Sequence, residues 1–84
     1  MARTFAQAKA AIWEHLSAKG WTMSNPMLKI PHATDADGFR LWFKAQAVYY
    51  SWGTSFAEAR SIHVDIRALD IPVFMSYIAR WKEH

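Results

Sequence analysis

Apolar residues in the first part of the chain recur at the spacing of a helix. They follow one another at intervals of three and four positions and so share one face: Phe5, Ala8, Ile12 and Leu16. Thr4 and Gln7 match a capping box, in which each side chain satisfies a free backbone amide at the start of a helix. Gly20 suits the left-handed residue that follows a helix end. The pattern predicts a helix over residues 4–19.

The next segment has the features of a short strand and a turn. The tripeptide Ser-Asn-Pro signals a turn, and residues 27–34 after it predict a strand with Leu28 and Ile30 on its inner side. Pro31 cannot donate to a strand ladder, so this strand lies at a sheet edge or ends there. The sequence Asp-Ala-Asp-Gly at 35–38 has the chemistry of a hairpin turn.

Residues 39–50 alternate with a period of two. One set of alternate positions is largely apolar: Phe39, Leu41, Phe43, Ala45, Ala47 and Tyr49. The other set mixes cations with aromatic rings: Arg40, Trp42, Lys44, Gln46, Val48 and Tyr50. Because successive side chains of a strand point to opposite faces, we expect one long strand with the first set toward the core and the second toward solvent.

Residues 56–67 fit two structures. Ser55 and Glu58 match a second capping box, and an apolar stripe at helical spacing follows: Phe56, Ala59, Ile62, Ile66 and Leu69. Evidence for a strand is the strict alternation of three β-branched residues with polar ones: Ile62, Val64 and Ile66 with His63, Asp65 and Arg67. Since β-branched residues pack well on a pleated surface, the alternation favours a helical turn near 56–60 and a strand over 61–67.

A second helix is predicted from Asp70, which is a good N-cap, with Pro72 tolerated in the first turn. Its apolar residues lie on one face: Ile71, Phe74, Ile78 and Trp81. The element order is therefore helix, three antiparallel strands and helix. We expect an α+β two-layer sandwich in which both helices cover one face of a three-stranded sheet.

The length of 84 residues predicts a single domain over 1–84. With no cysteine, disulfides and thiolate metal sites are excluded, and five Trp, five Phe and three Tyr supply core bulk instead. No apolar run approaches the roughly 20 residues of a membrane span, and the first residues do not resemble a signal peptide. We expect a cytoplasmic protein without membrane contact.

The solvent face of the predicted sheet is the candidate binding site. Its residues are Arg40, Trp42, Lys44, Gln46, Tyr50, His63 and Arg67. Trp beside Arg and Lys is typical of protein interfaces and of platforms for single-stranded nucleic acid. Ten Lys and Arg against seven acidic residues permit an acidic partner. The alternative is structural, with Trp42 covered by a loop or with Arg and Lys stems lying over the rings.

Catalytic chemistry is not predicted. The four histidines are far apart in sequence and lack the paired spacing of a zinc site, and the three glycines form no phosphate-binding loop. Asp35 and Asp37 fit solvated turn residues better than a carboxylate pair. We therefore expect no catalytic residue, no metal site and no cofactor.

The order of elements resembles the double-stranded-RNA-binding domain. That family docks RNA through a lysine cluster at the start of its second helix and through its first hairpin loop. Here the second helix opens with Asp-Ile-Pro-Val-Phe and the hairpin tip reads Asp-Ala-Asp-Gly, so neither position suits phosphate. The resemblance therefore implies the fold without the RNA docking sites.

The segments LWFKAQAVYY and ARSIHVDIR resemble small uncharacterised accessory proteins of bacteriophages and prophages. This resemblance implies a compact protein that binds a host or phage component in the bacterial cytoplasm. We expect a non-enzymatic binding module that holds a nucleic acid or nucleoprotein complex. The alternatives are an inhibitor of a host protein, of the anti-CRISPR or other anti-defence type, and a homodimeric accessory protein.

Overall fold

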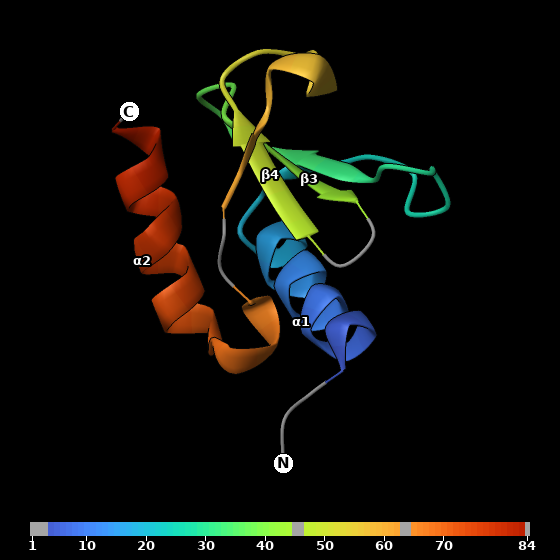
Figure 1. The fold of residues 1–84 in the computed structure, drawn as a ribbon, viewed down its shortest axis with the longest axis vertical. Coiled ribbons are helices and arrows are strands. Elements are labelled where there is room, and N and C mark those ends of the chain that lie inside the picture. Colours follow the sequence, from blue (N-terminus) through green and yellow to red (C-terminus); the bar gives the residue numbers. More distant parts are fainter. Residues whose placement is uncertain (1–3, 45–46, 63–64, 84) are drawn as a thin grey trace.

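The computed structural model describes residues 4–44, 47–62 and 65–83. They form two helices, two short 3-10 turns and a five-stranded antiparallel sheet whose strand order follows the chain (Figure 1). The elements are α1 (Phe5–Ala18), β1 (Thr22–Met23), β2 (His32–Thr34), β3 (Arg40–Lys44), β4 (Ala47–Ser51), η1 (Phe56–Glu58), β5 (Arg60–Ser61), η2 (Ile66–Ala68) and α2 (Ile71–Lys82). The α+β class is confirmed, whereas the prediction of three strands is wrong.

Both predicted helices are present and begin at the predicted caps. The Thr4 hydroxyl accepts a hydrogen bond from the Gln7 amide at 3.1 Å, and the Gln7 side chain accepts one from the Thr4 amide at 3.0 Å. Asp70 accepts a hydrogen bond from the Val73 amide at 3.0 Å at the start of α2. Gly20, with φ of 90°, follows α1 in the left-handed conformation that glycine adopts without strain.

The predicted strand over 27–34 is mostly a loop. Only His32–Thr34 pairs in the sheet, and Leu28, predicted on the inner side, is 47% exposed. Asn25 accepts a hydrogen bond from the Met27 amide at 2.9 Å, and the Ser24 hydroxyl accepts one from the His32 amide at 2.9 Å. These local bonds offer the backbone an alternative to a strand ladder. The ladder is completed instead by β1, which the sequence pattern did not predict.

The long strand predicted over 39–50 is a hairpin of β3 and β4. Lys44 lies opposite Ala47 and Trp42 opposite Tyr49, so an even-numbered residue of β3 faces an odd-numbered residue of β4. Opposite residues of an antiparallel pair share a face. Tyr49 therefore joins Trp42, and Tyr50 lies on the other face. The expectation that Tyr50 faces solvent beside Trp42 is wrong.

The helical turn predicted near 56–60 is confirmed by η1, but the strand predicted over 61–67 is wrong. The strand β5 covers only Arg60–Ser61, and η2 follows from Ile66. Asp65 accepts a hydrogen bond from the Arg67 amide at 3.0 Å and pairs with its guanidinium at 2.7 Å. This local capping closes a turn in place of continued sheet pairing.

The two helices and the inner face of the sheet share one core. The inner face presents Ala33, Leu41, Phe43 and Val48 to helix residues that include Ile12, Leu16, Phe74, Ile78 and Trp81, all of them buried. In Figure 1, α1 crosses beneath the sheet, η2 lies near α1 at the start of α2, and η1 lies at the opposite end of the view. The sheet therefore keeps a second face, away from the helices.

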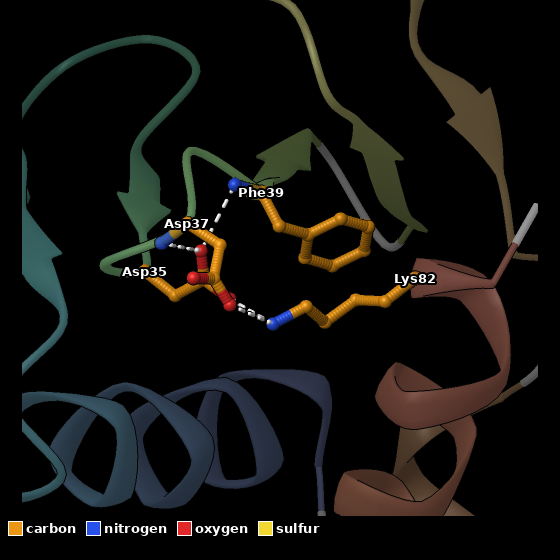
Figure 2. A network of polar contacts seen from close by, with 4 residues as sticks. All are labelled: Asp35, Asp37, Phe39 and Lys82. Atoms are coloured by element: carbon orange, nitrogen blue, oxygen red, sulfur yellow. Dashed lines mark hydrogen bonds and ion pairs between the residues drawn. The ribbon is translucent and has the colours of Figure 1, made fainter.

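A polar network ties the end of α2 to the turn between β2 and β3 (Figure 2). The Lys82 ammonium donates to Asp35 at 2.7 Å and to Asp37 at 3.0 Å. The second carboxylate oxygen of Asp35 accepts from the amides of Asp37 and Phe39, each at 2.9 Å. The same ammonium lies 6.0 Å from the centre of the Phe39 ring and 5.8 Å from that of Trp52. Asp35 is therefore a structural residue and not a solvated turn residue.

This network predicts a loss of stability in acid. Burial raises the pKa of Asp35, but the hydrogen bonds from Lys82 and from the Phe39 and Asp37 amides outweigh it and hold this pKa below its usual value. The carboxylate therefore contributes stability that is complete above about pH 4 and is lost as the pH falls through the lower folded-state pKa. We expect urea midpoints to fall from pH 5 toward about pH 2, and to fall less in Asp35→Asn.

The comparison with Asp35→Asn is needed because a second carboxylate titrates in the same range. The side-chain hydrogen bond from Arg67 lowers the pKa of Asp65 to about 2. If the wild type and Asp35→Asn lose the same stability over this pH range, Asp35 does not carry the effect.

Candidate binding face of the sheet

The outer face is defined here as the sheet face away from the helices. Strand register places ten residues on it, in three rows across the sheet: Thr22, Thr34, Arg40 and Ser51; His32, Trp42, Tyr49 and Ser61; Lys44 and Ala47. These positions hold two cations, a histidine, five hydroxyl groups and no carboxylate. The composition favours an anionic partner.

Trp42 lies beneath other side chains of the same chain. Its side chain is 3% exposed, and the ring of Phe56 from η1 meets it edge-on with centroids 5.9 Å apart. The Arg40 guanidinium lies 5.6 Å from its ring centre. The expectation of an exposed Trp42 is wrong, and the structural alternative, a covering loop with a cation over the ring, is confirmed.

Phe56 is positioned locally and closes a small aromatic cluster on the outer face. The Ser55 hydroxyl accepts a hydrogen bond from the Ala57 amide at 3.3 Å and caps η1. Phe56 then packs edge-on against Tyr49, with centroids 5.0 Å apart, as well as against Trp42. Trp42, Tyr49 and Phe56 form the outer aromatic cluster. It anchors η1 to the sheet and supports the cations above it.

Tyr50, predicted for the binding site, belongs to the core side. Its ring stacks on Trp81 of α2, with centroids 5.4 Å apart and planes 10° from parallel, and on Phe39 at 5.9 Å. Tyr49 is the residue that sequence reasoning missed on the outer face. A two-residue turn after Lys44, had it been predicted, would have placed Tyr49 and not Tyr50 on the face of Trp42. Such a turn changes the register and so exchanges the faces of the two tyrosines.

Arg40 and Lys44 supply the charge of the outer face. Arg40 is half-buried, and its Nε donates to the Thr34 hydroxyl at 2.8 Å. Lys44 is exposed, and its ammonium lies 5.3 Å from the centre of the Phe56 ring. Within the described ranges, neither cation has a carboxylate within 4.0 Å. Both charges are therefore available to a bound anion.

Arg67 does not join these cations. It lies on η2, which packs against α1, and it is already paired with Asp65. Gln46 and His63, the other predicted members of the site, lie outside the described residues. Of the predicted set, the structure therefore brings together Arg40, Trp42 and Lys44, with Trp42 in a supporting position.

In the part of the chain that the structure describes, no three His, Asp or Glu side chains gather closely enough to hold a metal ion. No described helix is long and apolar enough to cross a membrane.

Comparison of the chain with protein-family models, with curated proteins and with solved structures found no match. The resemblances to phage accessory proteins and to the double-stranded-RNA-binding domain therefore stay predictions.

Proposed function

We propose that this chain is a non-enzymatic binding module that holds the phosphate backbone of a nucleic acid, alone or in a nucleoprotein complex, against the outer face. One observation carries the proposal. Arg40 and Lys44 project from the same face of β3, both seated on aromatic rings and neither paired with a carboxylate among the described residues. At about 3.3 Å per residue they stand roughly 13 Å apart along the strand, far enough to contact separate phosphates.

Neighbouring groups support phosphate binding. Arg40 Nε donates to the Thr34 hydroxyl at 2.8 Å, which fixes the guanidinium on the outer face. Ser51 lies opposite Arg40 in the ladder, and Tyr49 lies one row away. Arg, Lys, Ser and Tyr side chains are frequent donors to phosphate oxygens.

The burial of Trp42 sets the expected mode of binding. A covered indole cannot stack on a base, so the ligand would be held mainly by charge and by hydroxyl donors. Such contacts position a backbone and carry little sequence information. We therefore expect weak sequence preference and a steep dependence of affinity on salt.

The test compares two double variants that each remove two positive charges. Arg40→Gln/Lys44→Gln alters the outer face, and Lys19→Gln/Arg80→Gln alters exposed cations of the helix layer. Fluorescence anisotropy with labelled mixed-sequence oligonucleotides, single- and double-stranded, gives affinity from about 50 to 200 mM salt. We expect the first variant to bind at least about tenfold more weakly and its slope of log K against log salt to be shallower by about 1.4–1.8.

Three results would contradict the proposal. One is that the wild type binds neither oligonucleotide even at low salt. Another is that both double variants lose affinity equally, which would indicate net charge alone. The third is oligonucleotide binding that is insensitive to salt, because contacts to phosphate weaken as salt rises. Urea unfolding checks that both variants remain folded.

A second candidate is a protein–protein inhibitor of the phage anti-defence kind. The observation that favours it is Trp52, 45% exposed beside Arg60 at a shallow cavity of about 130 Å³. Trp and Arg are the residue types that dominate interface energetics. Capture from a nuclease-treated bacterial lysate, followed by reconstitution with the purified partner, tests it. Binding should be lost in Trp52→Ala and kept in Arg40→Gln/Lys44→Gln.

A further inference from the structure

A histidine lies between the two cations of the outer face. His32 of β2 stands opposite Trp42 in the ladder. Arg40 and Lys44 lie two positions before and after Trp42, on the same face of β3. At about 3.3 Å per residue, the row that holds His32 is roughly 7 Å along the strand from each cation. An anion that spans Arg40 and Lys44 must therefore cross this row.

The centre of the row is covered, and its β2 side is not. The Phe56 ring packs edge-on against Trp42 and Tyr49, with centroids 5.9 and 5.0 Å apart, and Trp42 is 3% exposed. His32 stands on the opposite side of Trp42 from Tyr49 and is partly exposed. Its ring centroid lies 6.4 Å from that of Trp42. The imidazole is therefore the side chain through which the β2 side of this row meets a ligand.

The charges around His32 favour an anion. The titratable and charged groups near it come from β3, from β4 and from the connection before β2: Arg40, Lys44, Tyr49 and Lys29. On the opposite side His32 meets Ser24, whose hydroxyl accepts from the His32 amide at 2.9 Å. Among the residues that the structure describes, no carboxylate lies within 4.0 Å of the imidazole. A bound phosphate would supply the negative charge that this surrounding lacks.

We propose that His32 is a third phosphate contact of the outer face and makes nucleic-acid binding tighter in mildly acidic solution. Histidine side chains change charge between about pH 5 and pH 8, whereas guanidinium, ammonium and phosphodiester groups keep theirs. Contact with phosphate favours the charged imidazolium, so binding takes up a proton and the affinity rises as the pH falls. This contact rests on the proposed function and adds one positive charge to it.

Fluorescence anisotropy with the same oligonucleotides at about pH 8 and about pH 5.5 tests the contact. We expect the wild type to bind at least about threefold more tightly at the lower pH, with a slope of log K against log salt steeper by about 0.7–0.9. Both changes should vanish in His32→Gln. They should persist in His15→Gln, which removes a histidine from α1. His32→Lys, whose charge is permanent, should bind at the higher pH about as tightly as the wild type does at the lower.

The outcomes separate this contact from the proposed function. Wild-type affinity that is equal at the two pH values, or a pH dependence that His32→Gln retains, overturns the contact alone, provided that Arg40→Gln/Lys44→Gln still weakens binding. A wild type that binds at neither pH overturns both. Circular dichroism of each variant at both pH values controls for folding. The stability from Asp35 is complete above about pH 4, so the fold should persist at the lower pH.

Discussion

Trp42→Ala should destabilise the fold by about 3–5 kcal/mol, the range for removing a buried large aromatic side chain. Trp42 is enclosed by Phe56, Arg40 and its own sheet, so its loss leaves a cavity that η1 cannot fill without moving. Domains of this size have only about 5–15 kcal/mol of stability in total. Urea unfolding followed by circular dichroism measures the change.

Trp52→Ala is the matched control, because it removes the same side chain from a half-exposed position. We expect Trp52→Ala to lower the free energy of unfolding by less than half as much as Trp42→Ala, since a solvated ring loses fewer contacts. Equal stability of the two variants would mean that Trp42 is not enclosed. Because Trp42→Ala is expected to lose so much stability, a loss of binding in this variant would not identify an interface. The variants at Arg40 and Lys44 are the better probes of binding.

Asp35→Ala should cost about 2–3 kcal/mol of unfolding free energy. The substitution leaves the amides of Asp37 and Phe39 without their acceptor and leaves Lys82 paired with the exposed Asp37. The side chain of Asp35 is 11% exposed, so water replaces few of these bonds. Urea unfolding at neutral pH measures the loss.

Asp37→Ala is the control for this network. Its carboxylate also accepts from Lys82, but it is 71% exposed. Exposed ion pairs contribute about 0–1 kcal/mol, so we expect a small change. If the two alanine variants were equally destabilised, the amide hydrogen bonds of Asp35 would not be the source of its effect.

The helices could be predicted from the sequence because their signals are local. Apolar spacing and capping side chains lie within a few residues of one another, and Thr4 and Asp70 make the expected bonds. The same was true of η1, whose cap is Ser55. The number of strands could not be predicted, since β1 and β5 are two residues long and carry no period.

The turn between β3 and β4 has no recognisable sequence signal. Between Lys44 and Ala47 the chain has neither Gly, Pro nor Asn, which are the usual turn residues. The alternation of apolar and polar residues also continues across it, so one long strand fitted the pattern. A change of register moves every later side chain to the other face, and this alone exchanged Tyr49 and Tyr50.

The candidate site could be predicted only in part, because some of its features follow from local periodicity and others depend on contacts between distant segments. Arg40 and Lys44 stand four positions apart in one strand, so their common face followed from the period of two. The cover over Trp42 comes from Phe56, and its contact depends on the path of the chain between them. Arg67 was placed wrongly because its bond to Asp65 closes a turn, and alternation alone did not predict that bond.

The neighbour-to-neighbour order of the strands bears on how the chain folds. Every ladder of the sheet joins segments that follow each other in sequence, so few long loops must close and the chain entropy lost at each step is small. The hydrogen bond between Lys82 and Asp35 spans 47 positions and requires α2 to reach the hairpin. Low contact order favours rapid folding of the sheet, with docking of the last helix as the step that joins distant parts of the chain.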